Sequence, residues 1–177
     1  MHDEPWQVFA ENGEPIDGLS YRKADFPTDA IMGAAHIWLW RRGDAGIAVM
    51  LQKRASNLSS WPGYYDISAA GHIDENETPL KSAVRETAEE IGLDADIGRF
   101  KFAFTSRTPL AKYEIDFVYL YEVSEEFVAT FDDGEVELVE WVSLDDFAVR
   151  TKDPEDYNLL NQGEHYFGLL IDQLNRL

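Results

Sequence analysis

The segment TPLKSAVRETAEEIGL, residues 78–93, constrains the fold more than any other part of the sequence. Its apolar side chains recur every three or four positions, the spacing of one face of an α-helix. They are Leu80, Ala83, Val84, Ala88 and Ile91. Thr78 is suited to cap this helix with Pro79 at its first position, and Gly92 is suited to end it. The segment therefore predicts one amphipathic helix.

The segments on either side of this helix predict strands. A short strand, a turn at Asn12 and Gly13, and a second extended piece fall within residues 6–18. Further strand-like runs occupy residues 34–40, 46–54, 98–107, 114–123 and 135–144, and the small, half-apolar run 67–72 predicts a short buried strand. The first two of these runs flank a turn-like segment and predict a hairpin. A short helix is expected after Ser143 and a longer one over residues 155–177. This order predicts an α+β fold with a mixed sheet and helices on its faces.

Composition limits the domain count, the compartment and the partners. The chain has 177 residues, of which 45% are apolar, so we expect one domain over residues 1–177, with residues 1–30 as an N-terminal extension of strands and turns. It carries 15 Lys and Arg against 34 Asp and Glu, and a net charge of −19 disfavours binding to a nucleic-acid polymer. The absence of Cys excludes disulfides and thiolate chemistry. The sequence contains neither a membrane-length apolar run nor a secretory signal pattern, so we expect a cytoplasmic protein without membrane partners.

Four charged residues, Arg85, Glu86, Glu89 and Glu90, fall within six positions of the predicted helix. Spacings of three and four place the three carboxylates on the face opposite the apolar one. Glu86 and Glu90 repel each other, and the C-terminal half of a helix disfavours negative charge. Two interpretations stay open from this cluster alone: an ordinary solvated face, or a site for a hard divalent cation such as Mg²⁺.

The residues around this cluster resemble the Nudix box, G-x5-E-x7-R-E-U-x-E-E-x-G-U, in which U is a bulky apolar residue. The match spans residues 71–93 and includes every fixed glycine and charged position. These positions are Gly71, Glu77, Arg85, Glu86, Glu89, Glu90 and Gly92. Leu93 fills the last apolar position, and Thr87 at the first apolar position is the one departure. A match of this length in a strand, loop and helix context favours the cation site over the solvated face.

The resemblance implies both a fold and a chemistry. Nudix enzymes fold as an α/β/α sandwich with a mixed sheet between helices, and they hold Mg²⁺ or Mn²⁺ against a substrate diphosphate. The metal ligands that the resemblance implies are the carboxylates of Glu86, Glu89 and Glu90 and the carbonyl of Gly71. It further implies that Glu86 can activate the attacking water, that Arg85 holds the carboxylate rotamers, and that Glu77 lies over the start of the helix.

Residues 6–147 also resemble the branch of this family that includes isopentenyl-diphosphate isomerase. That enzyme uses the same fold to protonate a carbon–carbon double bond, so isomerisation is the rival function. It requires a Cys just before the box, where this chain has Ala70. It also carries an acid-x-acid pair on a later strand, which we match to Lys112 and Glu114, so that one acid is lost.

The metal-binding histidines of the isomerase correspond only in part to residues of this chain. His36 and His72 match two of them, and Asp29 stands at the upstream position. The intact box and the missing Cys favour diphosphate hydrolysis over isomerisation. A structural role also stays open for each histidine: His36 is expected to be a hydrogen-bonded core residue, and His72 a substrate contact or a loop histidine.

Five further residues are candidates for the site, and each has an ordinary structural alternative. Glu114 is a candidate ligand or base, or an exposed strand residue. Lys53 and Arg54 are candidate phosphate contacts, or charges that solvate the end of a strand. Trp61 can form a wall of the substrate pocket or anchor its own loop. Asp66 is expected to order that loop rather than to react.

The sequence as a whole predicts a Nudix hydrolase that acts on a small-molecule diphosphate. The predicted reaction is Mg²⁺-dependent pyrophosphohydrolysis of a nucleoside diphosphate or another organic diphosphate, with Mn²⁺ as an alternative ion. An isomerase and a non-catalytic ligand-sensing domain remain the two rivals, and the intact acidic box argues against the sensor. A homodimer is left open.

Overall fold

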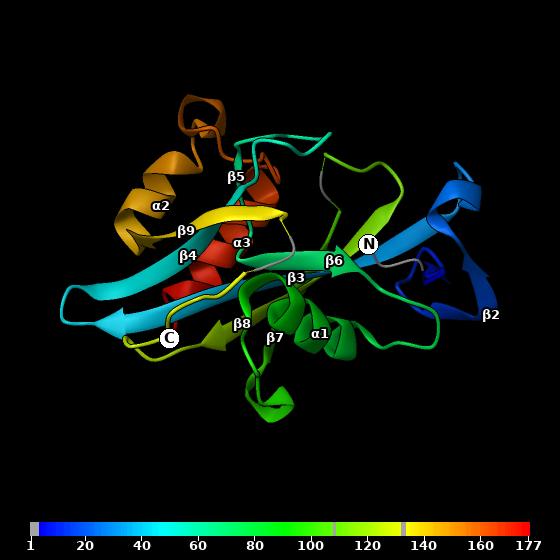
Figure 1. Ribbon diagram of the computed structural model, residues 1–177, viewed down its shortest axis with the longest axis horizontal. Coiled ribbons are helices and arrows are strands. Elements are labelled where there is room, and N and C mark those ends of the chain that lie inside the picture. Colours follow the sequence, from blue (N-terminus) through cyan, green and yellow to red (C-terminus); the bar gives the residue numbers. More distant parts are fainter. Residues whose placement is uncertain (1–3, 108, 132–133) are drawn as a thin grey trace.

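A long central strand organises the computed structural model, which describes residues 4–107, 109–131 and 134–177 (Figure 1). This strand, β3 (Ile31–Gly43), belongs to a mixed sheet formed by all nine strands of the described residues. The other strands are β1 (Trp6–Phe9), β2 (Pro15–Tyr21), β4 (Gly46–Arg54), β5 (Tyr65–Asp66), β6 (Ala69–His72), β7 (Lys101–Ser106), β8 (Glu114–Glu122) and β9 (Val136–Ser143). Along one side β3 pairs antiparallel with β1, β6 and β4 in turn, and along the other side it pairs parallel with β8.

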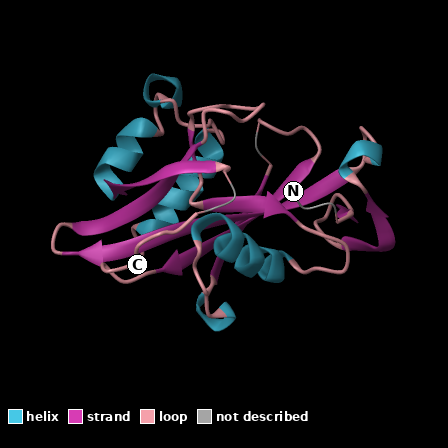
Figure 2. Ribbon diagram, in the orientation of Figure 1, coloured by secondary structure: helices cyan, strands magenta, loops and turns pink. Residues whose placement is uncertain are grey.

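Helices cover both faces of this sheet (Figure 2). The α-helices are α1 (Pro79–Ile91), α2 (Leu144–Arg150) and α3 (Glu164–Leu174), and the 3-10 helices are η1 (Lys23–Asp25), η2 (Ile97–Arg99) and η3 (Pro154–Tyr157). Successive side chains of β3 alternate between the faces, so Ile37 packs with α1, whereas Trp38 packs with α2 and α3. The predicted α+β sandwich is confirmed. Within the described residues, no helix combines the length and the apolar character needed to cross a membrane.

The predicted ends of the helix α1 are confirmed. The Thr78 hydroxyl accepts a hydrogen bond from the Lys81 amide at 3.3 Å, and Pro79 occupies the first helical turn. Gly92 ends the helix in the left-handed region, at φ 66°, and a side chain there would also collide with Thr130. Both needs explain why the chain has glycine at this position.

The helix predicted over residues 155–177 is wrong in its first part, because α3 begins only at Glu164. Asn158 and Gly163 both have left-handed φ values, 49° and 95°, which an α-helix cannot accommodate. The segment between them instead bonds to β5: the Leu160 amide donates to the Tyr65 carbonyl at 2.9 Å. This connection carries the residues just before α3 toward the end of β5.

A fork in the sheet creates room for the box carboxylates. The strand β6 pairs with the first part of β3, over Ala34–Ile37, and β4 pairs with its last part, from Trp40 onward. At the branch, the Ser68 hydroxyl accepts from the Leu39 amide at 2.9 Å and donates to the Met50 carbonyl at 2.7 Å. The edge of β6 that faces away from β3 therefore pairs with no strand of the described residues, and its backbone groups can bond to side chains of α1.

Candidate active site

Gly71 lets the helix α1 pack directly against the strand β6. A side chain at this position would run into the carboxylate of Glu86. Glu86 is itself buried, with 8% of the residue exposed, although it belongs to the acidic face of the helix. The box glycine is therefore required by close packing of backbone and carboxylate, and not by a left-handed turn.

Arg85 connects the box carboxylates to one another. Its Nη1 donates to Glu86 at 2.6 Å and to Glu89 at 3.3 Å. Its Nε and Nη2 donate to the two carboxylate oxygens of Glu77 at 3.3 and 3.0 Å. Nη2 also donates to the carbonyl of His72 at 3.0 Å, which joins the network to β6. Arg85 thus bonds to three of the four box carboxylates, those of Glu77, Glu86 and Glu89.

Glu90 reaches the free edge of β6 at the fork. Its Oε2 accepts from the Ala70 amide at 3.1 Å and from Nε2 of Gln52 at 3.0 Å. Burial raises the pKa of Glu90 well above its usual range, and the charge of Glu86 raises it further. Burial also raises the pKa of Glu86, against the opposing effect of Arg85.

These carboxylates fit a divalent cation. The buried Glu86 and the half-buried Glu90 lie on one helix face, where burial disfavours the charged form of each, and Arg85 joins the more exposed Glu89 to Glu86. A hard cation offsets such a concentration of negative charge and takes carboxylate oxygens as ligands. Glu86, Glu89 and Glu90 are therefore the candidate ligands for Mg²⁺ or Mn²⁺ on this helix.

The expectation that the Gly71 carbonyl completes the ligand set does not fit the strand pairing. In an antiparallel pair, the backbone groups of successive residues alternate between the two edges of the strand. The Ala70 amide and the His72 carbonyl both bond to side chains of α1, so Gly71 directs its carbonyl toward β3, where it pairs with Ala35. The carbonyl that faces the box carboxylates is that of Ala70.

A second polar cluster lies on the face of the sheet opposite α1. His72 Nε2 lies 3.2 Å from Glu114, and His36 Nε2 lies 3.5 Å from Asp116. One ligand atom each from His36, Glu114 and Asp116 lie within 4.8 Å of one another, so this group can also hold a cation. Burial lowers the pKa of His36 to about 4, which leaves the imidazole neutral. Tyr166 on α3 completes its surroundings, with its hydroxyl 3.0 Å from His36 Nδ1.

The acid-x-acid pair is present on β8, contrary to our match of Lys112 and Glu114. Lys112 precedes the strand, with its Nζ 4.7 Å from the ring of Tyr113. Glu114 and Asp116 lie two positions apart and therefore share a face of β8. Alternate residues of a strand lie on the same face, so the sequence itself places Asp116 on the same face as Glu114. Burial alone would raise the pKa of Glu114, but hydrogen bonding to His72 and nearby charge lower it.

A cavity of about 430 Å³ is lined by His36, His72 and Glu114 of the second cluster and reaches β6 at Ala70. Its lining includes Trp6, Arg54, Trp61, Ala70, His72 and Gln162. Trp6 stacks on His72 with the ring centroids 3.8 Å apart, so the N-terminal extension forms one wall. Ala70 joins the cavity to the box because its amide bonds to Glu90.

The two predicted phosphate contacts occupy different places. Arg54 lines the cavity and pairs with Asp66 at 3.3 Å. Lys53 points to the other face of β4 and pairs with Glu137 at 2.8 Å, away from the cavity lining. Trp61 lies at the cavity with about half of its surface exposed. The structure thus brings Arg54 and Trp61 to the candidate site, and it does not bring Lys53 there.

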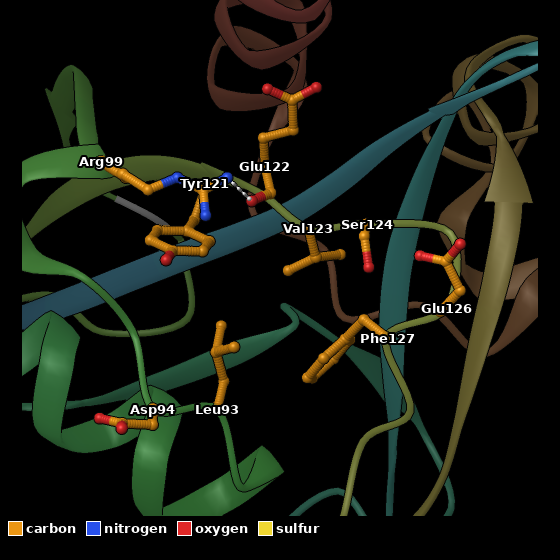
Figure 3. A pocket seen from close by; sticks show the side chains of 9 residues that line it. All are labelled: Leu93, Asp94, Arg99, Tyr121, Glu122, Val123, Ser124, Glu126 and Phe127. Atoms are coloured by element: carbon orange, nitrogen blue, oxygen red, sulfur yellow. Dashed lines mark hydrogen bonds between the residues drawn. The ribbon is translucent and has the colours of Figure 1, made fainter.

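A separate cavity of about 490 Å³ lies beyond the end of α1 (Figure 3). Figure 3 shows the side chains of Leu93, Val123 and Phe127 converging on it. Arg99 at its rim lies over the ring of Tyr121, 5.1 Å from its centroid, and donates to the Glu122 carbonyl at 3.0 Å. The residues that line this cavity include no member of either polar cluster, and they do not include Ala70 or His72, whose backbones bond to the box, so the chemistry does not belong there.

Relatives share both the sequence pattern and the fold. The chain is 34% identical over 105 residues to Nudix hydrolase 3 of Arabidopsis thaliana, across 59% of this chain and 13% of that protein. It is also 34% identical over 113 residues to an isopentenyl-diphosphate Delta-isomerase of Cutibacterium acnes, across 58% of this chain and 57% of that protein. The chain therefore spans less than two thirds of either relative.

Solved structures agree on the fold. A crystal structure from Deinococcus radiodurans superposes with a TM-score of 0.66 at 16% identity, covering 98% of both chains. The NUDIX domain of NrtR from Shewanella oneidensis, solved with ADP ribose, superposes with a TM-score of 0.62 at 19% identity, covering 87% of this chain and 94% of that one. The family model described as NUDIX domain matches residues 31–162, which include the box and both polar clusters. The chain belongs to the Nudix domain family.

Proposed function

We propose that the protein is a metal-dependent hydrolase that cleaves the diphosphate linkage of a nucleotide or another organic diphosphate. One observation carries this proposal: Glu86, which is buried, and Glu90, which is half-buried, share one helix face where burial raises the pKa of both, and Ala70, whose amide bonds to Glu90, lines a cavity large enough for a small ligand. Two neighbouring carboxylates that are partly removed from water disfavour their charged forms, and a bound cation compensates for this. A non-catalytic sensor has no need of this arrangement.

The side chains have distinct tasks in this proposal. Glu86, Glu89 and Glu90, with the carbonyl of Ala70, hold Mg²⁺ or Mn²⁺. When bound, such an ion neutralises the diphosphate and lowers the pKa of a water so that it attacks phosphorus near neutral pH. Arg85 keeps the carboxylates in place through its bonds to the box.

Two further groups act on the substrate from the cavity side. Arg54 faces the cavity and offers a guanidinium to a phosphate oxygen. The pKa of Glu114 is lowered, so its carboxylate is ionised near neutral pH. Glu114 and Glu86 are the two carboxylates that can accept the proton of the attacking water. The cluster of His36, His72, Glu114 and Asp116 provides a place for an additional cation.

Metal binding should appear as thermal stabilisation. We expect Mg²⁺ to raise the melting temperature of the wild-type protein, because the ion offsets repulsion between buried carboxylates that the unfolded chain does not have. The double substitution Glu86→Gln and Glu90→Gln should abolish most of this increase. Differential scanning calorimetry with and without Mg²⁺ measures it, and an equal increase in both proteins would place the ion elsewhere.

The isomerase is the second candidate because the pair Glu114 and Asp116 is intact beside two histidines and because isomerase-named relatives match the chain. The sequence has Ala70 where the resemblance requires Cys, and it contains no Cys at all. We expect incubation with isopentenyl diphosphate and Mg²⁺ to produce no double-bond migration, as followed by proton NMR. Formation of the isomeric diphosphate, without release of phosphate, would establish the isomerase instead.

A further inference from the structure

Gln162 lies in the non-helical segment that the structure places between η3 and α3. The backbone around it is fixed, because the Leu160 amide bonds to β5 and the Gly163 amide donates to Asn161 Oδ1 at 2.9 Å. The Gln162 residue is 5% exposed and lines the cavity beside the box. It is therefore a buried polar side chain in a defined position next to the candidate site.

The carboxamide of Gln162 has unused hydrogen-bonding capacity. Its Oε1 is buried and has no hydrogen-bond partner among the described residues. Buried polar groups in folded proteins are normally paired, and an exception needs a reason. A half-turn of the terminal torsion exchanges the oxygen and the nitrogen, so either can face a ligand in the cavity.

The rest of the cavity fits a flat organic group. Trp6 and Trp61 supply aromatic surface, and Met32 and Leu110 supply aliphatic surface. These apolar side chains lie among polar and charged ones, and in sites for small organic ligands such polar groups set specificity. Because Ala70 joins this cavity to Glu90, an organic group held here would leave its diphosphate at the box.

We propose that Gln162 is a specificity-determining residue, whose carboxamide pairs with a donor-and-acceptor edge on the organic group of the substrate. The substrate class that fits is a diphosphate attached to a planar heterocycle with an amide-like edge, held in the cavity that Trp6 and Trp61 help to line. A plain hydrocarbon diphosphate leaves the carboxamide unpaired and is disfavoured. This inference rests on the proposed hydrolysis where it is tested by kinetics. Where it is tested by ligand binding, it does not require hydrolysis.

The test replaces Gln162 with Met, which keeps the length of the side chain and removes its polar atoms. Because the lost oxygen has no partner, we expect the melting temperature to stay unchanged or to rise, which excludes a folding defect. We expect kcat/KM for diphosphates of uridine and guanosine to fall at least about tenfold, mainly through KM, and kcat/KM for alkyl diphosphates to stay unchanged. The matched control is Gln173→Met on α3, because Gln173 is not among the residues that line the cavity. This substitution should change kcat/KM for neither class of diphosphate.

Equilibrium binding separates this inference from the proposed function. Uridine and guanosine monophosphates and an alkyl monophosphate are titrated into wild-type protein and the Gln162→Met variant by calorimetry, without turnover. Loss of about tenfold in affinity for the nucleotides alone supports the role of Gln162, even if no diphosphate is hydrolysed. Equal changes for both ligand classes, or none, overturn it, even if hydrolysis is confirmed.

Discussion

Glu90→Gln is expected to reduce metal-dependent diphosphate hydrolysis by roughly two to three orders of magnitude, because one lost ligand removes a few kcal/mol of charge stabilisation. The same change should leave the metal-free protein as stable as the wild type or more stable. The amide keeps the shape of the carboxylate and can accept the hydrogen bonds of Ala70 and Gln52, while a buried charge disappears. Steady-state rates and thermal melts of the two proteins measure both effects.

Glu75→Gln is the matched control for this prediction. Glu75 is exposed and lies within the box loop, at a position where the box pattern fixes no residue. Its replacement removes one negative charge from the box, as Glu90→Gln does, and we expect the rate to remain near that of the wild type. A Glu90→Gln variant as active as the control would show that Glu90 is not a ligand.

Gly71→Ala should have the largest effect on both stability and activity. The added methyl group would occupy the space of the Glu86 carboxylate, so this carboxylate must leave its place beside β6 and its hydrogen bond to Arg85. We expect a loss of about 1–3 kcal/mol in the free energy of unfolding, the usual range for overpacking, together with loss of most hydrolysis. Denaturant unfolding and steady-state rates provide the measurement.

Two companion variants separate the collision from a general effect of the substitution. Gly168→Ala, in the middle of α3, meets no atom within 4 Å and should be neutral or stabilising. The double variant Gly71→Ala with Glu86→Ala removes the colliding carboxylate, so it should regain stability but not activity. If Gly71→Ala folds and reacts like the wild type, the packing of Glu86 against β6 is wrong.

Local patterns predicted the parts of the structure that depend on local physics. The cap at Thr78, the stop at Gly92 and the acidic face of the helix all follow from neighbouring residues, and the structure has them. The strands around the helix also follow from runs of apolar residues. The box positions were identifiable because their spacing is fixed by one loop and one helix.

Other parts of the site depend on contacts between distant segments. Asp116 is fully buried within an apolar strand. It becomes a candidate site residue only because the fold places it beside His36. Gln162 reaches the cavity because left-handed residues interrupt a segment whose composition predicts a helix. Glu86 is buried because α1 packs closely against β6. The spacing of residues along the helix does not predict this contact.

The central claim is tested most directly by hydrolysis in ¹⁸O-labelled water. Wild-type protein and Glu90→Gln are incubated with Mg²⁺ and a panel of nucleoside di- and triphosphates, dinucleotides, nucleotide sugars and isoprenoid diphosphates, and the products are analysed by mass spectrometry. The account predicts that at least one diphosphate is cleaved by the wild-type protein, with one labelled oxygen in a phosphate product, and that this requires Mg²⁺ and Glu90. Cleavage that persists in Glu90→Gln, or no cleavage across the panel, would contradict it.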